Sequence, residues 1–197
     1  MAIIGALHTG YTVRDMAASL DFYCGLLGFR LISERPEITA QFFRDIVGMP
    51  HAVVHAVLLE IPGTAHTLEL FEYKHPEGAA QRLTPTCNPG SARLCYQVDD
   101  LNVMYEQLKA AGCEFISAPH FIDSGPSTGA WALYMKDPNG APIELQQRPV
   151  QASATGSPVS AERKAASTTS SAFTPSSPLI NGGRFSRMQA ANSSTIA

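Results

Sequence analysis

The chain has no long hydrophobic run, no basic N-terminal segment and no closely spaced cysteine pair. Without an apolar stretch of about 20 residues, a membrane-spanning helix is excluded. The first residues, MAIIGALHTG, also lack the pattern of a secretory signal peptide. The four cysteines, Cys24, Cys87, Cys95 and Cys113, form no CxxC motif, which argues against a thiolate zinc site or a disulfide framework. We therefore expect reduced thiols in a cytoplasmic protein.

A strong charge imbalance is also missing. The formal net charge is -3 and the pI is about 6.0, so neither nucleic acid nor an anionic membrane surface is an expected partner. Apolar residues make up 45% of the chain, which is enough for an ordinary globular core. The 197 residues can form one domain, or two small modules that share a core.

The composition changes after Gln147. Residues 151–197 are dominated by Ser, Ala and Thr, with scattered Pro and Gly and few charges. Such a segment cannot bury enough apolar surface to offset the entropy lost on ordering. The sequence therefore predicts a folded domain over residues 1–150 and a disordered tail over residues 151–197.

An internal repeat is visible when the folded part is aligned with itself. Placing His8 on Arg93 produces further matches: Tyr11 with Tyr96, Val13 with Val98, and Asp15 with Asp100. A repeat of this kind predicts two modules, at about residues 5–75 and 90–148.

Each module shows the pattern of a strand, a helix and three further strands. Alternating apolar residues precede Asp15, a residue type suited to the start of a helix, and Gly28 is suited to its end. In the second module the strand after the helix is expected at residues 113–117. The string DPNG, at residues 137–140, is a strong hairpin signal between the last two strands. We predict an α+β fold built from two βαβββ units.

Strand alternation places four polar side chains on the open faces of the sheets, away from the helices. They are His8 and Glu69 in the first module, and Arg93 and Glu144 in the second. Taken singly, each would be an ordinary core or surface residue. Together, at repeat-related positions, they favour a site, because two carboxylates and an imidazole in one hollow can bind a metal ion.

Four segments carry a family resemblance: LHTGYTVRDMAASLDFYCGLLGFRL, HTLELFEY, YQVDDLNVMYEQLKAAG and YMKDPNGAPIELQQ. Jointly they resemble the vicinal oxygen chelate superfamily, of the glyoxalase, bleomycin resistance and extradiol dioxygenase type. The segment FRDIVGMPHAVVHAVLLEIPG further resembles the branch that contains 2-epi-5-epi-valiolone epimerase.

The resemblance implies a cup-shaped mixed sheet, formed by the two modules around one divalent ion (Mn, Zn, Co, Ni, Mg or Fe). Family ligands lie on the first and last strand of each module, which here gives a metal set of His8, Glu69 and Glu144. Arg93 departs from the family pattern, because its protonated guanidinium has no lone pair to offer a metal. The resemblance also implies a small oxygenated substrate and a homodimer.

Three main interpretations of these residues are possible: two mechanisms for one class of enzyme, and a protein without catalysis. In the first, a water completes the three-ligand metal site. In the second, Arg93 replaces the metal, pairs with Glu69 or Glu144 and stabilises an enolate oxygen, while the other carboxylate moves the proton. Both readings predict an epimerase, isomerase or lyase with Glu69, Glu144 and Arg93 as catalytic residues. In the third, the protein is a non-catalytic small-molecule binding or resistance protein. An extradiol dioxygenase is a weaker alternative, because its iron favours two histidines and a carboxylate.

Overall fold

The structure is a computed structural model that describes residues 2–79 and 85–149. The predicted tail, residues 151–197, lies outside the described residues, so its disorder stays a prediction. In the described part of the chain, no helix has both the length and the apolar character needed to cross a membrane.

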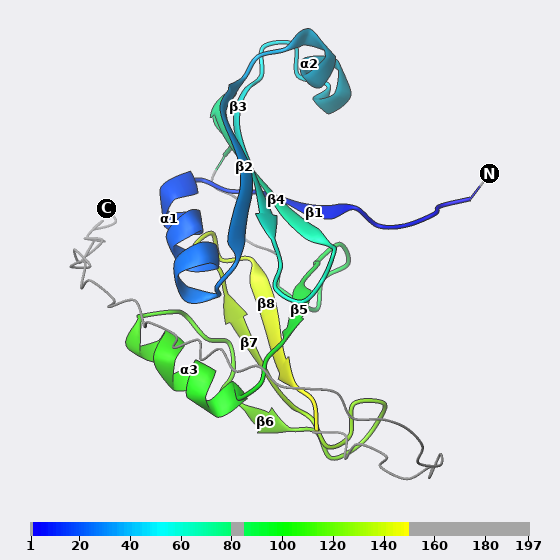
Figure 1. Cartoon of the computed structure of the whole chain (residues 1–197), viewed down its shortest axis with the longest axis vertical. Coiled ribbons are helices and arrows are strands. Elements are labelled where there is room, and N and C mark those ends of the chain that lie inside the picture. The colour runs from blue at the N-terminus through cyan, green and yellow to red at the C-terminus, as the bar shows by residue number, and fades with distance from the viewer. Residues whose placement is uncertain (1, 80–84, 150–197) are drawn as a thin grey trace, which may run out of the picture. The chain divides into compact units, whose positions relative to one another are not determined.

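The first module begins with an edge strand and closes with a hairpin (Figure 1). Its helix starts after Asp15, whose Oδ1 accepts a hydrogen bond from the Ala18 N–H at 3.0 Å. The helix continues as a wider π-helical stretch, and Gly28 follows it with a φ of 74°. The elements are β1 (His8–Thr12), α1 (Met16–Leu20), η1 (Asp21–Leu26), β2 (Arg30–Ile38), α2 (Gln41–Val47), β3 (Val53–Glu60) and β4 (Thr67–His75).

The second module repeats this order with a longer regular helix. Its helix starts after Asp100, whose Oδ1 accepts from the N–H groups of Asn102 and Val103. The same residue type therefore begins the helix in both modules. The elements are β5 (Leu94–Gln97), α3 (Leu101–Ala110), β6 (His120–Phe121), β7 (Trp131–Lys136) and β8 (Pro142–Gln147).

The strand expected at residues 113–117 is not regular, and that prediction was wrong. Phe115 forms an isolated bridge with Met135, and the next two N–H groups, of Ile116 and Ser117, both donate to the carbonyl of Tyr134. Because one carbonyl serves two donors, the alternating ladder of an antiparallel pair is interrupted. The two-residue strand β6 takes the edge position instead.

The described residues form two four-stranded sheets, in the orders β1-β4-β3-β2 and β5-β8-β7-β6. Strand β1 runs parallel to β4, and β5 runs parallel to β8. The other neighbouring strands in each sheet are antiparallel. Both sheets are therefore mixed, and the prediction of an α+β fold from two repeated βαβββ modules is confirmed. Helix α2 is an addition between β2 and β3 that the sequence pattern did not indicate.

A single apolar cluster joins the two modules. It contains Leu68 and Leu70 of the first sheet, Ile143 and Leu145 of the second, and residues of α1 and α3. These strand residues are at most 1% exposed and lie on the helix-side faces of their sheets. Because both helix-side faces share one core, the open face of each sheet points away from it.

Polar contacts, one of them buried, also connect the modules. The Tyr23 hydroxyl donates to Oδ2 of Asp137 at 3.2 Å, and Asn139 accepts from the Arg14 N–H at 2.9 Å. Asp137 is only 6% exposed and also accepts from the Ala141 N–H at 2.7 Å. The DPNG turn therefore closes the second hairpin and links it to the first module through these hydrogen bonds.

Candidate functional site

On the last strand of each module, β4 and β8, burial alternates as the sequence pattern predicts. On β4, Leu68 and Leu70 are fully buried, while Glu69 between them has a side chain that is 28% exposed. On β8, Glu144 likewise alternates with buried Ile143 and Leu145. Neighbouring strand positions point to opposite sides of a sheet, so both glutamates lie on open faces.

In the first module the structure brings His8 beside Glu69. The two residues come from the parallel strands β1 and β4, and Nε2 of His8 lies 3.4 Å from Oε2 of Glu69. The His8 side chain is 45% exposed, so this pair is accessible to a ligand from the open face. An imidazole next to a carboxylate can accept or pass on a proton that the carboxylate receives.

In the second module Arg93 occupies the place of the histidine. Its Nε–H donates to Oε2 of Glu144 at 3.0 Å, and its guanidinium carbon lies 5.0 Å from the centre of the Tyr134 ring. The hydrogen bond that Arg93 donates to Glu144 is the main cause that raises the pKa of Arg93. A permanent cation is therefore held by a carboxylate on one side and by an aromatic ring below.

The structure does not bring the predicted metal ligands together in one chain. His8 and Glu69 form one pair, Glu144 is engaged by Arg93, and no group of three His, Cys, Asp or Glu side chains among residues 2–79 and 85–149 is arranged to hold a metal ion. The reason is that the two open faces point away from the shared core. A three-ligand site built by a single chain does not fit the described residues.

Arg148 is a further charged residue near this face, and the sequence reasoning missed it. Its positive charge acts on the Cys95 thiol from beyond the end of β8, as Arg93 does from the start of β5. Burial and then Glu144 nevertheless keep the pKa of Cys95 raised. The available signal was strand periodicity, because Arg148 follows Glu144 and Gln146 at intervals of two residues.

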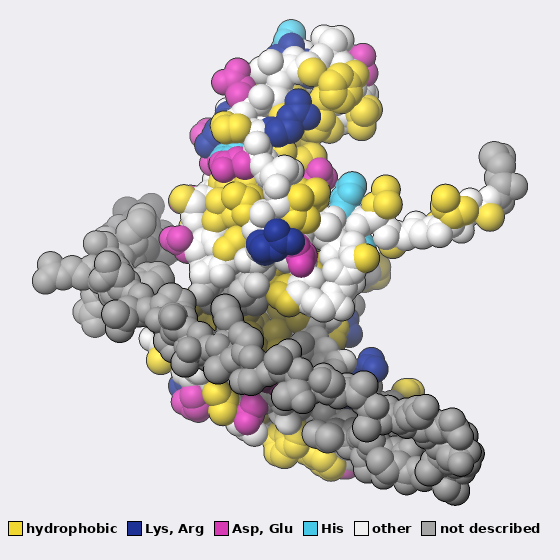
Figure 2. All heavy atoms as spheres, in the orientation of Figure 1, with side chains coloured by type: hydrophobic (Ala, Val, Ile, Leu, Met, Phe, Trp, Pro, Cys, Tyr) yellow, Lys and Arg dark blue, Asp and Glu magenta, His cyan; other side chains and the backbone are white. Residues whose placement is uncertain are grey.

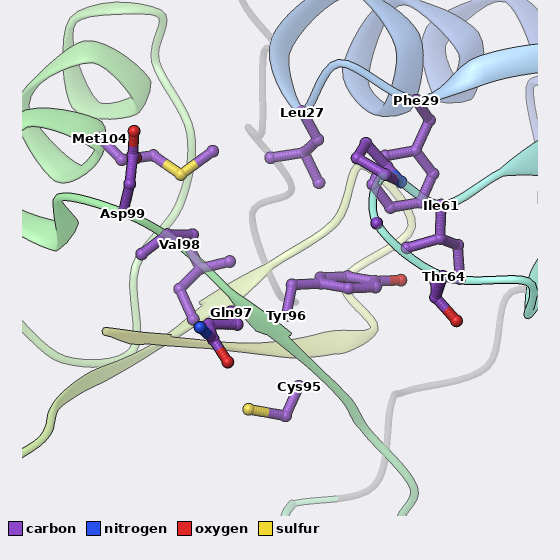
Figure 3. Close-up of a pocket in the computed structure, with 13 residues that line it drawn as sticks. Leu27, Phe29, Ile61, Thr64, Cys95, Tyr96, Gln97, Val98, Asp99 and Met104 are labelled. Carbon is purple, nitrogen blue, oxygen red and sulfur yellow. The ribbon is translucent and has the colours of Figure 1, made fainter. Parts of the chain in front are cut away.

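A separate cavity lies where the two modules meet (Figure 3). It has a volume of about 490 Å³ and is lined by Leu27, Phe29 and Ile61 from the first module and by residues 95–99 from the second. His8, Glu69, Arg93 and Glu144 are not part of this lining. The cavity is therefore distinct from the predicted polar site.

Comparison with known proteins gives the family. The model of the Glyoxalase/Bleomycin resistance protein/Dioxygenase superfamily matches residues 5–145, which is most of the chain. The chain belongs to this superfamily. Among solved structures, a glyoxalase family protein from Bacillus cereus is similar, with a TM-score of 0.66 and 17% sequence identity, over 75% of this chain and 96% of that one. This likeness reflects the shared fold.

Two curated members of the glyoxalase superfamily are similar in sequence. A 2-epi-5-epi-valiolone epimerase from Actinomyces sp is 28% identical over 148 residues, which cover 74% of this chain and 80% of the relative. A lactoylglutathione lyase from Pseudomonas putida is 24% identical, over 71% of this chain and 83% of the relative. The relatives are thus an epimerase and a lyase, while the superfamily also includes resistance proteins.

Proposed function

We propose that this protein is a small-molecule epimerase, isomerase or lyase that moves a proton on a carbon next to a carbonyl group. One observation carries the proposal: at repeat-related positions on the two open faces, Glu69 adjoins His8 and Glu144 adjoins Arg93. A carboxylate for the proton and a cation for the oxygen are the two parts that such chemistry needs. The similarity to an epimerase and a lyase supports the proposal.

Glu69 is assigned the role of the base. Its contact with His8 is longer than that between Arg93 and Glu144, and its side chain is 28% exposed against 17% for Glu144. Glu69 takes the proton, and the electron pair of the broken C–H bond moves to the carbonyl oxygen, which forms an enolate. Protonation of the same carbon from its opposite face by water gives an epimer, and Glu69 then releases its proton to solvent; transfer of the proton from Glu69 to a neighbouring atom gives an isomer.

Arg93 is assigned to the enolate oxygen. Its N–H donors carry positive charge at any physiological pH, and charge aimed at a developing oxyanion lowers the barrier. Glu144 and Tyr134 hold the guanidinium in place, so Glu144 acts mainly through Arg93. A divalent ion on His8, Glu69 and Glu144 would supply the same Lewis acidity, but Arg93 engages Glu144 and has no lone pair to offer a metal. No step is therefore assigned to a metal.

A homodimer is part of the proposal, because Glu69 and Arg93 must reach one substrate from faces that point away from a common core. In a pair of chains, the first sheet of one copy can face the second sheet of the other. Apolar side chains suited to such an interface are exposed on the N-terminal arm and on α2 (Figure 2). They are Ile3, Ile4, Leu7, Phe42, Ile46 and Met49.

The proposed compartment is the cytoplasm, and the thiols support it. Cys24, Cys87, Cys95 and Cys113 are all free. Burial raises the pKa of Cys24 and Cys113, so these two thiols stay protonated and unreactive. Free thiols persist most readily in a reducing compartment.

A non-catalytic small-molecule binding protein is the alternative, and the cavity between the modules favours it. Its volume of about 490 Å³ falls within the range of about 300–1,000 Å³ that is typical of ligand sites. Leu27, Phe29 and Ile61 give it an apolar wall that suits a ring system. A protein of this kind would bind its ligand without changing it.

Exchange of a substrate hydrogen with solvent tests the enzymatic proposal. The protein is incubated in D₂O with 2-epi-5-epi-valiolone and related keto-cyclitols, each with and without a phosphate group, and proton NMR follows the signal at the carbon next to the carbonyl. We expect Glu69→Gln and Arg93→Gln to slow exchange at least about 100-fold, because they remove the base and the oxyanion donor. Glu106→Gln, at an exposed position on α3, should leave the rate unchanged.

Circular dichroism establishes that each variant is folded before its rate is interpreted. Undiminished exchange in both Glu69→Gln and Glu144→Gln would contradict the enzymatic proposal. A ligand that raises the melting temperature with concentration but loses no hydrogen would instead support the binding protein.

A further inference from the structure

The open face of the second sheet carries more positive than negative charge around Cys95. Cys95 pairs in register with Glu144, the carboxylate that Arg93 contacts. Arg93 lies before the start of β5 and Arg148 after the end of β8, so the two arginines reach Cys95 from opposite ends of a pair of parallel strands. This strand pair therefore carries one carboxylate, Glu144, and an arginine at each end.

Arg93 is held so that one edge of its guanidinium stays free. The Nε–H is directed to Glu144, and the plane lies over the Tyr134 ring. In the described residues, no hydrogen bond or ion pair joins the two terminal nitrogens to the protein, and the side chain is 45% exposed. The terminal edge of an arginine is a fork that matches two oxygens of a carboxylate or phosphate.

Arg148 supplies the second charge. It is exposed, and among residues 2–79 and 85–149 no carboxylate forms an ion pair with it. Its charge nevertheless acts on the Cys95 thiol, as the charge of Arg93 does. Because Arg148 has no ion-pair partner among the described residues, its guanidinium is available to an anion on the face that also carries Arg93.

We propose that Arg93 and Arg148 form an anion-binding subsite over Cys95, and that the substrate of this protein carries a carboxylate or a phosphate group. The proposal rests on the proposed function in one respect: the anionic group lies beside the reacting carbon, so the terminal edge of Arg93 contacts one oxygen of that group together with the enolate oxygen. Glu144 does not block the subsite, because it contacts the Nε side of Arg93 and leaves the terminal edge open. The Tyr134 ring restricts the guanidinium before the ligand arrives, which lowers the entropic cost of binding.

Binding of simple anions tests the subsite without turnover. Inorganic phosphate and malonate are titrated separately into the full-length protein at constant ionic strength, and side-chain arginine NMR signals report the dissociation constants. We expect saturable binding of at least one anion, weakened about tenfold or more by Arg93→Gln and several-fold by Arg148→Gln. Phosphate binding tighter than malonate binding would identify a phosphate subsite, and the reverse order a carboxylate subsite.

Arg30→Gln is the matched control, because Arg30 is also an exposed arginine paired with a glutamate, Glu60, but lies in the first module. Arg148→Gln is the second test in case Arg93→Gln does not fold. The inference is overturned if neither anion binds, or if all three variants bind as well as the native protein. Arginine-dependent binding together with unchanged exchange in the Glu69→Gln variant would leave the subsite intact and refute the proposed reaction instead.

Discussion

Arg93 donates a hydrogen bond from Nε to Oε2 of Glu144 across 3.0 Å, where the repeat-related His8 lies 3.4 Å from Glu69. Each module thus pairs a glutamate with a basic side chain, which is a histidine in the first module and an arginine in the second. The first pair places an imidazole, a group that can carry a proton, beside its carboxylate. The second keeps a fixed positive charge, because a guanidinium does not deprotonate in proteins. In the proposed reaction, the first pair therefore transfers the proton and the second pair stabilises the negative charge on the oxygen.

Replacing Arg93 with histidine should increase metal binding. The native protein should hold well below one equivalent of divalent metal, because Arg93 offers no lone pair and engages Glu144. In Arg93→His the imidazole becomes a ligand and Glu144 is released, so the content should rise toward one equivalent. Elemental analysis of the purified proteins measures this, with Arg30→His as the control. One equivalent in the native protein would instead support a site of His8, Glu69 and Glu144 completed by two copies.

Charge on the N-terminal arm should dissociate the proposed homodimer. Ile4 is fully exposed and Leu7 is 80% exposed, so burial of each against a second copy contributes about 1.5–3 kcal/mol. We expect sedimentation to give twice the mass of one chain for the native protein. The double variant Ile4→Asp/Leu7→Asp should give the mass of one chain. Val103→Asp, at an exposed position on α3, should remain dimeric. A monomeric native protein at micromolar concentration would contradict this prediction.

Stability should fall as the pH rises above 10. Burial is the main cause that raises the pKa of Tyr11, Tyr23 and Tyr96 above the ordinary value of 10.0, and Asp137 adds to it in all three. Above pH 10 the unfolded chain loses these protons while the folded chain keeps them, so unfolding becomes easier by about 1.4 kcal/mol per pH unit for each of Tyr23 and Tyr96, and by less for the partly exposed Tyr11. This contribution is fully present below pH 10.

Urea unfolding between pH 8 and pH 11 measures the decline. The Tyr23→Phe variant should be about 1–2 kcal/mol less stable near neutral pH, because Asp137 loses a buried donor. Its stability should then decline less steeply above pH 10, since one ionisable hydroxyl is gone. Parallel curves for the native protein and the variant would show that Tyr23 is not responsible.

Local pattern was sufficient for the helix starts and for the sides of the strands. Asp15 and Asp100 each accept from backbone N–H groups at the start of a helix, as their position before an apolar repeat predicts. The alternation around Glu69 and Glu144 was equally readable, because side chains on consecutive strand residues point in opposite directions.

The irregular segment at residues 113–117 shows where local pattern fails. Its residues have the apolar alternation of a strand, but Ile116 and Ser117 both donate to the carbonyl of Tyr134. Which donor meets which acceptor depends on a strand that follows later in the chain. Register of this kind is a long-range property, and the sequence of one segment does not contain it.

The sequence by itself determined that His8, Glu69, Arg93 and Glu144 lie on open faces, since strand alternation depends only on consecutive residues. Only the tertiary structure decided that Arg93 takes Glu144 as its partner and that the first pair lies apart from the second. The physical reason is the shared core: both helix-side faces bury their apolar residues in one cluster, which leaves the open face of each sheet pointing away from that core. That arrangement follows from contacts between residues far apart in the chain.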